Sequence, residues 1–398
     1  MFLIITLVIK AVMAQDSTID PALLLNVFGT PPTPSKSGNT SPKLEEITIR
    51  PTDKNEFVDK NGESCKCVPY YLCDSNLVGV DVNNVSATGW GSCDSRFGED
   101  ECQESVERCC TSPKDEKDVV VPTPRPLRGC GYRNPKGVDF TIAGGSGAEA
   151  EFGEFPWVVA LINSKNDSYI GVGVLIHPQV VMTGAHVVHD YATGSVKIRA
   201  GEWDTQTTRE RLKSVEKLVV DNSSHPDFLR KSVKNDVVLL KLETPLELAE
   251  HINVICLPSQ DEDFNRYRGC VANGWGKDVF GLQGRYAVIL KKVEVDMVPY
   301  TKCNEQLKAT RLGPKFKLHT SFVCAGGEEG KDTCQGDGGA PLACPIGDDR
   351  YKLTGLVAWG IGCGEKDVPA VYVNVPAFRN WVDGEMTKWG YDTAGYTI

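Results

Sequence analysis

The sequence of 398 residues has no excess of basic side chains: 43 Lys and Arg stand against 53 Asp and Glu, a formal net charge of −10. A nucleic-acid-binding surface needs basic groups to neutralise phosphates, so this balance argues against a nucleic-acid partner. The sequence also lacks an apolar run of the roughly 20 residues that a transmembrane helix requires. We therefore expect neither nucleic acid nor a membrane among its partners.

The one apolar run at the start, MFLIITLVIKAVMA, is shorter than a membrane span and ends in small residues before Gln15. That pattern is typical of a signal peptide, although Lys10 interrupts it. An anchoring helix is the alternative, but the run is too short for one. We predict a signal peptide at residues 1–14 and a secreted, extracellular mature chain.

Cysteines and glycosylation sequons fit secretion. The chain has 15 cysteines, a density that suits an oxidising compartment. Because the number is odd, at least one thiol lacks a partner within the chain. The N-x-S/T sequons, which are candidate glycosylation sites, are Asn39, Asn84, Asn166 and Asn222.

Composition divides the mature chain into four segments. Residues 15–60 carry little periodic apolar pattern and are predicted to be a flexible arm. Residues 61–111 hold seven cysteines, as a small crosslinked domain would. Residues 112–139 are rich in proline and charge and are predicted to be a linker. From residue 140 to 398, short apolar runs alternate with Gly, Pro and polar turns, which favours an all-β barrel or sandwich ending in a short helix.

Two residues of the last segment are candidates for nucleophilic catalysis. His186 follows the apolar run VVMTGA, and Asp236 begins the run DVVLLKL. A serine-type hydrolase needs a hydroxyl, an imidazole that takes its proton, and a buried carboxylate that orients the imidazole. Taken singly, each is better explained as a structural residue.

The order His186, Asp236 and then Gly336-Asp337-Gly338-Gly339-Ala340-Pro341 resembles that of the chymotrypsin-like serine proteases. Further stretches match in family order: Phe155-Pro156-Trp157, Asn273-Gly274-Trp275-Gly276 and Ala358-Trp359-Gly360. The resemblance covers roughly residues 140–390. It implies an all-β fold, a chymotrypsin-like double β-barrel with a C-terminal helix, preceded here by a small disulfide-rich domain.

The chain departs from this family at the nucleophile. The family loop reads GDSGGP, and Gly338 occupies the place of the serine. Glycine has no side chain, so no acyl-enzyme can form there, and losing the serine of such a triad costs roughly 10⁶-fold in turnover. The triad His186, Asp236, Gly338 is therefore expected to be degenerate and the domain to be inactive as a protease.

The specificity pocket and the activation segment also depart from the family. The resemblance places a pocket remnant at Asp332, Gly360 and Ala370, where the alanine methyl should crowd the pocket. Asp332 either binds a basic side chain or is a relic of descent, and Ala370 favours the relic. Active relatives are cut before Ile-Val-Gly-Gly to free an ammonium for the aspartate preceding the serine. No basic residue directly precedes Ile142, so Asp337 is expected to lack that partner.

The same resemblance sorts the cysteines of the barrel. It implies the pairs Cys130–Cys256, Cys270–Cys344, Cys303–Cys324 and Cys334–Cys363. The family's usual bridge beside the histidine is absent, because Gly171 and Val187 stand at its two ends.

The cysteine spacing of residues 61–111 resembles the clip domain of arthropod clip-domain proteases. This resemblance implies the pairs Cys65–Cys109, Cys67–Cys102 and Cys73–Cys110, and it leaves Cys93 unpaired. Cys93 would then form an intermolecular bridge or remain a capped thiol. If Cys93 rather than Cys102 were the fourth clip cysteine, the unpaired one would simply move.

A clip domain joined to a barrel with glycine for serine resembles the non-catalytic clip-domain serine protease homologues, among them prophenoloxidase-activating factor II and the masquerade-like proteins. The resemblance implies a proteolytically activated cofactor of prophenoloxidase activation, acting in melanisation and innate immunity in arthropod haemolymph. Its partners would be prophenoloxidase and an upstream clip-domain protease, with self-association after cleavage. The expected activation cut lies between Arg96 and Phe97; Arg50 is a poorer site because Pro51 follows it.

No cofactor is expected to be required, although related barrels bind Ca²⁺ at the place of the loop EWDTQTTRE. The resemblance therefore implies a Ca²⁺ site at Glu202 and Glu210, since calcium favours oxygen ligands. Arg209 and Arg211 argue against a cation there.

Two other functions remain as alternatives. One is a microbe-binding recognition or adhesion protein, for which the sequence has no distinctive lectin feature. The other is a residual serine-type hydrolase that uses the surviving oxyanion-hole amides of Gly336 and Gly338.

Overall fold

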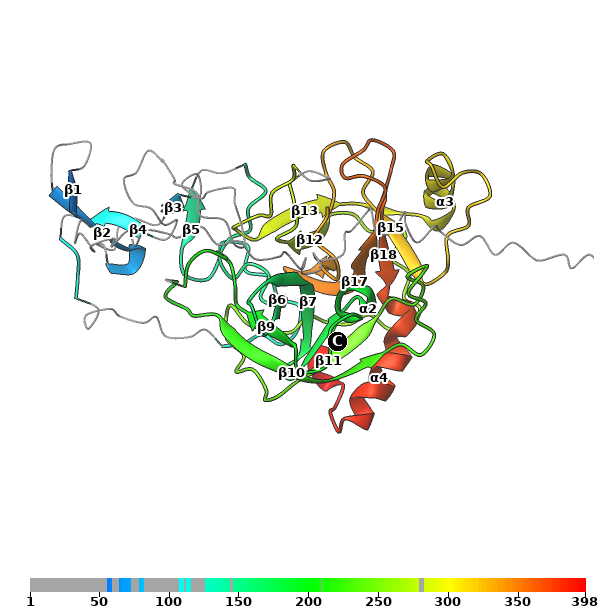
Figure 1. Cartoon of the computed structure of the whole chain (residues 1–398), viewed down its shortest axis with the longest axis horizontal. Coiled ribbons are helices and arrows are strands. Elements are labelled where there is room, and N and C mark those ends of the chain that lie inside the picture. Colours follow the sequence, from blue (N-terminus) through cyan, green and yellow to red (C-terminus); the bar gives the residue numbers. More distant parts are fainter. Residues whose placement is uncertain are drawn as a thin grey trace, which may run out of the picture.

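The computed structural model describes residues 56–58, 64–72, 79–81, 107–110, 112–115, 126–143, 146–208, 210–278 and 283–398. Strands dominate this part of the chain and helices are few and short (Figure 1). The all-β expectation is therefore confirmed. No helix in the described ranges is long and apolar enough to cross a membrane.

The first β unit of the larger domain is a closed six-stranded barrel with the strand order β10-β11-β8-β7-β6-β9. Its strands are β6 (Val158–Asn163), β7 (Tyr169–His177), β8 (Val180–Thr183), β9 (Val196–Ala200), β10 (Val215–Ser224) and β11 (Val238–Leu242). All neighbours in this barrel pair in the antiparallel sense. Short connections suffice for such pairing.

The second β unit is a seven-stranded sheet with the order β13-β12-β16-β17-β18-β15-β14. Its strands are β12 (Cys270–Gly274), β13 (Lys291–Val295), β14 (Met297–Val298), β15 (Phe322–Ala325), β16 (Pro341–Gly347), β17 (Arg350–Trp359) and β18 (Ala370–Asn374). Helix α3 (Tyr300–Lys308) connects β14 and β15. The expected two-unit β architecture is thus present, with one unit closed and the other open.

Strand β6 shows why its apolar run is continuous rather than alternating. Val159 and Leu161 point into the core of the closed barrel. Val158, Ala160 and Ile162 belong instead to the larger core that reaches the second sheet. Because both faces of the strand are buried, every position favours an apolar residue.

The expected C-terminal helix is α4 (Arg379–Lys388), preceded by the 3₁₀ turn η4 (Val375–Phe378). Val382 and Met386 lie one helical turn apart and are both fully buried, so the helix has one face on the core. Trp381 packs against the same core from a half-buried position.

The small N-terminal unit is a three-stranded antiparallel sheet. It consists of β1 (Glu56–Val58), β2 (Ser64–Pro69) and β4 (Glu107–Cys110), with the turn η1 (Tyr70–Leu72) after β2. Because β1 pairs with β2, this sheet begins ahead of residue 61, within the predicted arm. Strand β3 (Gly79–Asp81) pairs in parallel with β5 (Thr141–Ala143), so this unit contacts the start of the larger domain (Figure 1).

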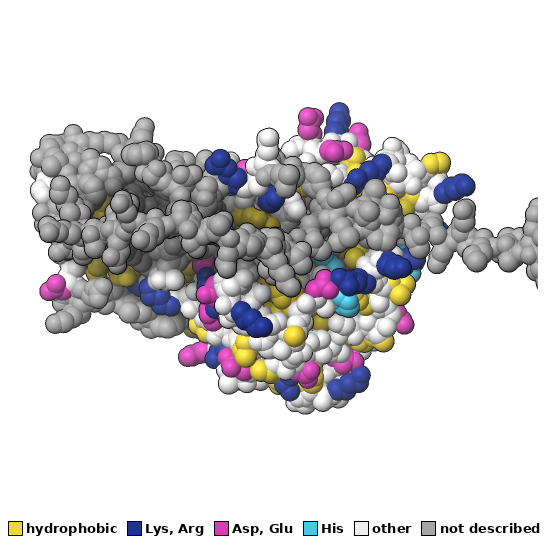
Figure 2. Space-filling view, in the orientation of Figure 1, with side chains coloured by type: hydrophobic (Ala, Val, Ile, Leu, Met, Phe, Trp, Pro, Cys, Tyr) yellow, Lys and Arg dark blue, Asp and Glu magenta, His cyan; other side chains and the backbone are white. Residues whose placement is uncertain are grey.

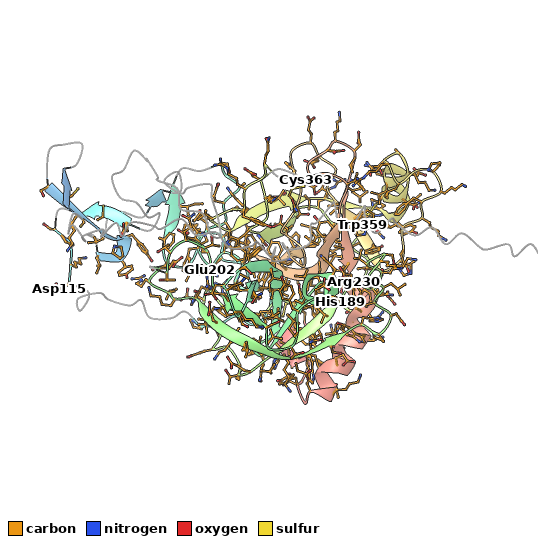
Figure 3. The ribbon with its side chains drawn as sticks, in the orientation of Figure 1. Asp115, His189, Glu202, Arg230, Trp359 and Cys363 are labelled. Carbon is orange, nitrogen blue, oxygen red and sulfur yellow. A yellow bond between two sulfur atoms is a disulfide. The ribbon has the colours of Figure 1, made fainter. Side chains whose placement is uncertain are left out.

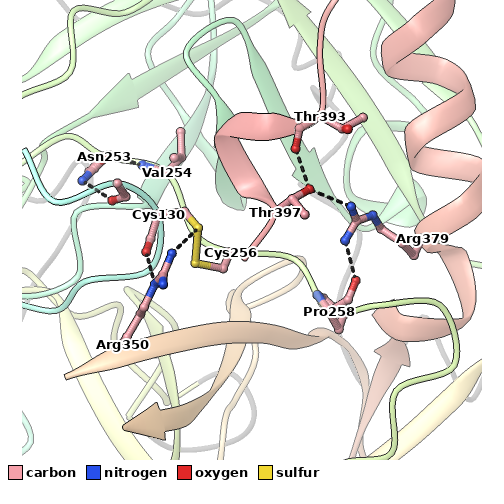
Figure 4. The surroundings of a disulfide bond; sticks show 10 residues. Cys130, Asn253, Val254, Cys256, Pro258, Arg350, Arg379, Thr393 and Thr397 are labelled. Carbon is pink, nitrogen blue, oxygen red and sulfur yellow. Dashed lines mark hydrogen bonds between the residues drawn. A yellow bond between two sulfur atoms is a disulfide. The ribbon is translucent and has the colours of Figure 1, made fainter. Parts of the chain in front are cut away.

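Four disulfides crosslink the larger domain, and they are the four pairs that the resemblance implied: Cys130–Cys256, Cys270–Cys344, Cys303–Cys324 and Cys334–Cys363. The first ties the predicted linker to the barrel (Figure 4). Arg350 reinforces it, because its guanidinium donates to the Cys130 carbonyl at 3.0 Å and contacts Sγ of Cys130 at 3.4 Å. The second half of the linker is therefore a structural part of the larger domain.

Candidate functional site

The site lies where the two β units meet, and three different elements supply its residues. His186 is on the one-turn helix α2 (Ala185–Val188), directly after β8. Asp236 precedes β11, the strand that pairs with β8, which brings it beside the helix. Gly338 lies in the turn before β16, and its carbonyl accepts a hydrogen bond from the N–H of Val172 in β7 at 3.0 Å. The structure thus brings all three sequence-predicted residues together.

His186 and Asp236 form the orienting half of a catalytic triad. The imidazole Nδ1 lies 2.5 Å from Oδ2 of Asp236, and the His186 backbone N–H donates to Oδ1 at 2.7 Å. The carboxylate is fully buried. Burial disfavours the imidazolium, but the charge of Asp236 and its hydrogen bond outweigh this, so the pKa of His186 is raised. Nε2 lies on the side of the ring that faces Gly338.

Gly338 stands where that reacting group would be. A Cβ added to Gly338 would lie 3.0 Å from Nε2 of His186 and 3.3 Å from Cγ2 of Val187. The side chain of any residue here would therefore point at the imidazole. With glycine in this position, residue 338 supplies no hydroxyl for His186 to deprotonate.

The missing bridge beside the histidine is replaced by direct packing. A Cβ on Gly171 would approach Cγ1 of Val187 to 2.8 Å and the carbonyl oxygen of Gly338 to 2.9 Å. The valine methyl therefore fills the space that a second residue would need. Because both cysteines are absent, Gly171 and Val187 make a close apolar contact at the place of the family's disulfide bond.

Asp337 has no cationic partner among the described residues. Its Oδ1 accepts the N–H of Gly276 at 2.8 Å, and Oδ2 accepts the N–H of Cys334 at 2.9 Å. Burial raises the pKa of Asp337 to about 6, and these two hydrogen bonds lower it only in part. The absence of a Cβ at Gly274 and Gly276 makes room for the carboxyl group, which a Cβ on Gly276 would approach to 2.4 Å.

Two tyrosines that no sequence motif indicated pack against the turn at Gly336. Tyr169 donates its hydroxyl to the carbonyl of Gly336 at 2.9 Å. The ring of Tyr286 lies so close to Gly336 that a Cβ there would meet it at 2.4 Å. Neither tyrosine belongs to a motif, and they come from distant parts of the chain, so no local pattern could have revealed them.

In the pocket remnant, both oxygens of Asp332 are already engaged by the backbone. Oδ1 accepts the N–H of Thr333 at 2.8 Å and Oδ2 accepts that of Gly364 at 2.9 Å. Burial raises the pKa of Asp332 to about 6. Ala370 is buried in β18, and a Cβ on Gly360 would meet only the carbonyl oxygen of Gly362, at 3.6 Å. Asp332 and Asp337 both line a cavity of about 610 Å³.

The segment at the position of the activation cut in active relatives makes other contacts in this chain. The N–H of Ile142 donates to Oε2 of Glu151 at 2.8 Å, and Thr141–Ala143 is strand β5, paired with β3. Asp139 pairs with Arg211 and accepts a hydrogen bond from the hydroxyl of Tyr70. These contacts hold the segment in place within the uncut chain, where it does not serve as a free amino terminus.

The loop 202–210 has features that suit a hard cation. Glu202 and Glu210 are buried at the edge of the barrel, and Glu202 lies on the side facing the N-terminal unit (Figure 3). Glu210 Oε1, Thr205 Oγ1 and Gln206 Oε1 are buried oxygens without a hydrogen-bond partner among the described residues. These are ligand types that Ca²⁺ accepts.

A competing cation also lies at this loop. Arg199 donates to Oε2 of Glu202 at 2.8 Å. In addition, the described ranges contain no group of three or more His, Cys, Asp or Glu side chains that could hold a metal. The carboxylates and neutral oxygens are thus present, and the calcium site at Glu202 and Glu210 stays a prediction.

Several predicted positions lie outside the described residues. These are the cut site Arg96–Phe97, the sequons Asn39 and Asn84, and the cysteines Cys73, Cys93 and Cys102, together with the side chain of Cys109. Cys65, Cys67 and Cys110 are disulfide-bonded. Asn166 and Asn222 are exposed, as a glycosylated asparagine must be.

Comparison with known proteins identifies the families that the two domains match. Residues 145–382 match the trypsin family, and residues 54–111 match the family described as serine protease clip domain PPAF-2. The fold and site thus define a trypsin-like domain preceded by a clip domain.

Individual relatives define the class of trypsin-like protein more narrowly. Phenoloxidase-activating factor 2 of Galleria mellonella is 48% identical over 299 residues, 72% of this chain and 98% of that protein. Two proteins named inactive CLIP domain-containing serine proteases are each 36% identical: A8 of Anopheles gambiae, over 80% of this chain and 88% of that protein, and A3 of Aedes aegypti, over 83% and 69%. The chain belongs to the clip-domain serine protease homologues.

Proposed function

We propose that this chain is a secreted, non-catalytic protease homologue that acts as a proteolytically activated cofactor in prophenoloxidase activation, within haemolymph melanisation. One observation supports the loss of catalysis above all: Nε2 of His186 faces the Cα of Gly338, where no hydroxyl can stand. The names of the relatives, phenoloxidase-activating factor and inactive clip protease, support the pathway.

The remaining parts of the site are those of a binding surface. Hydrogen bonds to the backbone fix Asp236, which orients His186, and Asp337 in the turn beside it. This ordered site supports a surface that still binds a protein partner. Removal of the nucleophile leaves such a surface able to bind a partner without cutting it. Figure 2 shows acidic and basic side chains interspersed over the visible face of the barrel, which suits a protein partner better than a polyanion.

The proposed switch is one cut by an upstream clip-domain protease. Hydrolysis of the Arg96–Phe97 bond would give Arg96 a carboxylate and Phe97 a free ammonium group. The cut lies between Cys73 and Cys102, so the implied disulfides would hold the two parts together. Self-association and binding to prophenoloxidase would follow the cut.

The test is reconstitution of prophenoloxidase activation with the upstream protease and the full-length mature chain. The wild type and an Arg50→Ala control should be cut, give a product that starts at Phe97, form larger assemblies on a sizing column, and raise phenoloxidase activity. An Arg96→Ala variant should do none of these. Activation that proceeds equally well with Arg96→Ala, or without the chain at all, would remove the proposed role.

The alternative hydrolase function has one supporting observation, the intact His186–Asp236 pair. It predicts turnover of ester or peptide substrates by the purified chain that disappears in a His186→Ala variant. Turnover that is absent, or that survives this substitution as a contaminant would, excludes it.

A further inference from the structure

Two neighbouring loops of the larger domain carry positive charge without acidic side chains. Residues 229–235 and 308–319 together hold seven Lys and Arg and no Asp or Glu, in a chain whose formal net charge is −10. The loops meet, because the N–H of Asn235 donates to Oγ of Ser321, just after the second loop, at 3.2 Å. Burial lowers the pKa of His319, and the charge of Lys234 on the other loop lowers it further. We call these two loops the basic surface.

Hydrogen bonds hold the backbone of the basic surface in place. In the first loop, the N–H of Leu229 donates to the carbonyl of Lys234 at 3.0 Å. In the second, the N–H of Leu318 donates to Oδ1 of Asn304 in α3 at 2.8 Å, and the hydroxyl of Tyr300 donates to the Leu318 carbonyl at 2.5 Å. Because the loops are already ordered, less conformational entropy is lost when a partner binds to them.

The charges of the basic surface are accessible to a partner. Lys231, Lys315 and Lys317 are exposed. Among the described residues, the only ion pair of this surface joins Arg230 to Asp190 at 2.6 Å. Both side chains of that pair are more than half exposed, so it contributes little stability and Arg230 can exchange Asp190 for another acid. A surface of this kind attracts an acidic partner.

An apolar side chain lies among these charges. Leu229 is 53% exposed and directly precedes Arg230. The ring of Phe228, which is half-buried, lies 5.8 Å from that of His189, edge to face, and so supports the first loop from below. Interfaces commonly place an apolar anchor at their centre and charges around it. The basic surface therefore fits a segment in which an aromatic residue stands beside several acids.

The chain itself contains a segment of that composition, residues 97–106, which lies outside the described residues. Its sequence is FGEDECQESV, with four acidic residues and no Lys or Arg. The proposed cut makes Phe97 a chain end. The uncut chain holds this segment at both ends, whereas the cut chain holds it at one end only. The cut therefore allows the segment to extend away from the molecule.

A second copy supplies the basic surface that this segment can reach. The segment is continuous with β4 of the clip sheet, which lies at the opposite end of the molecule from α3 (Figure 1). Arg230 likewise lies on the side away from Asp115, which follows the clip sheet (Figure 3). Ten extended residues span about 35 Å, whereas a domain of about 250 residues is about 45 Å across. The segment is thus too short to pass around its own larger domain.

We propose that the basic surface binds the segment 97–106 of a second, cut copy of this chain. Phe97 packs against Leu229, and the acidic side chains of the segment pair with the Lys and Arg of the two loops. Each cut copy then presents a segment at one end and a surface at the other, so the copies join head to tail and form a ring where the rotation between neighbours closes. This inference rests on the proposed cut, which frees the segment and leaves the basic surface unchanged.

A synthetic peptide tests the surface without the cut. The peptide FGEDESQESV has a free amino terminus and serine in place of Cys102, which prevents disulfide exchange. Its binding to the full-length, uncut mature chain is measured by isothermal titration calorimetry at low ionic strength. We expect the triple variant Lys231→Gln, Lys234→Gln and Lys317→Gln to bind the peptide about tenfold more weakly, because three exposed ion pairs are lost.

A matched triple variant controls for net charge. Lys136→Gln, Lys165→Gln and Lys366→Gln remove the same charge from exposed positions elsewhere, and together they should change the affinity less than about twofold. Near-ultraviolet circular dichroism verifies the native fold of both triple variants before titration. A peptide of the same composition with phenylalanine in the middle should bind about fivefold more weakly, because its ring is displaced from Leu229.

Mixing two forms of the chain tests the head-to-tail arrangement. The triple variant that lacks the charges of the basic surface, once cut by the upstream protease, keeps its free segment. The uncut wild type keeps its surface but has no free segment. Analytical ultracentrifugation should find each of these monomeric alone and a one-to-one pair, with nothing larger, in the mixture. Cut wild type, which has both parts, should form larger assemblies.

Several results would overturn this proposal. They are the absence of peptide binding to the wild type at millimolar concentration, equal affinity in the two triple variants, and equal assembly of the cut wild type and the cut surface variant. Equal binding of the rearranged peptide would show that any acidic partner is accepted, and would overturn the choice of this segment. If the protease does not cut at Arg96, the proposed switch fails, and the peptide titration still decides whether the surface binds the segment.

Discussion

The imidazole of His186 faces the Cα of Gly338 so directly that an added Cβ would lie 3.0 Å from Nε2. The base and its orienting carboxylate keep the arrangement of a hydrolase, while glycine stands at the position of the nucleophile. The site therefore retains the oriented base of an active protease without the group that attacks the substrate.

This relationship predicts the outcome of restoring a hydroxyl. A serine-directed organophosphonate should not label the wild type, whereas it should label Gly338→Ser, because the new Oγ would stand beside His186. Adding His186→Ala to that variant should slow labelling by about 10²–10⁴-fold, the usual contribution of a general base. Intact-mass spectrometry measures the adduct, and a labelled wild type would contradict the absence of a nucleophile.

Asp337 predicts a pH-dependent loss of stability. Its pKa rises from 3.8 in the unfolded chain to about 6 in the folded one, so the folded state holds the proton more tightly. The contribution of Asp337 to stability is then greatest below pH 4, falls as the pH rises toward 6, and levels off above it, by up to about 3 kcal/mol in all. Asp337→Asn cannot lose a proton. The unfolding free energy of the wild type minus that of the variant should therefore fall between pH 4 and 6.

Urea unfolding at a series of pH values measures this difference, and Asp348→Asn at an exposed turn is the control. A difference that stays constant with pH would show that Asp337 is not the titrating group.

The disulfides predict unequal stabilisation. Cys130–Cys256 closes a sequence separation of 126 residues, and Cys303–Cys324 closes one of 21. If restriction of the unfolded chain dominates, replacing both cysteines of the longer bridge by alanine costs about 1.6 kcal/mol more than the same change in the shorter one. Chemical denaturation of the two double variants compares the costs. Equal costs would show that native-state contacts, such as that of Arg350, decide the stability instead.

Two glycines predict opposite signs on substitution by alanine. A Cβ on Gly276 would press into the Asp337 carboxyl at 2.4 Å, so Gly276→Ala should destabilise the fold by about 1–3 kcal/mol. Gly384 lies inside helix α4, where a Cβ meets nothing within 4 Å. Gly384→Ala should therefore stabilise the helix by about 0.5–1 kcal/mol. Thermal unfolding of both variants measures these changes in stability. Destabilisation by both would contradict the packing around the two glycines.

The identity of the fold could be predicted from the sequence because its markers are local. His186, Asp236 and the glycine-rich turn each lie in a short stretch whose order along the chain is characteristic, and the alternation of apolar runs with turns is sufficient to indicate strands. The absence of a nucleophile is equally local, since it depends on the single residue Gly338.

Tertiary structure alone decided which charges meet. Asp139 is the last residue of the predicted linker, yet it joins Arg211 to Tyr70 of the clip domain, at sequence separations of 72 and 69 residues. Tyr169 reaches Gly336 across 167 residues in the same way. Such contacts are set by how strands pair and pack, and side chains on distant strands leave no periodic signal in the sequence. The residue types present were thus determined by the sequence, whereas the burial and partners that perturb the pKa values of Asp337, Glu202 and Glu210 were decided only by the folded arrangement.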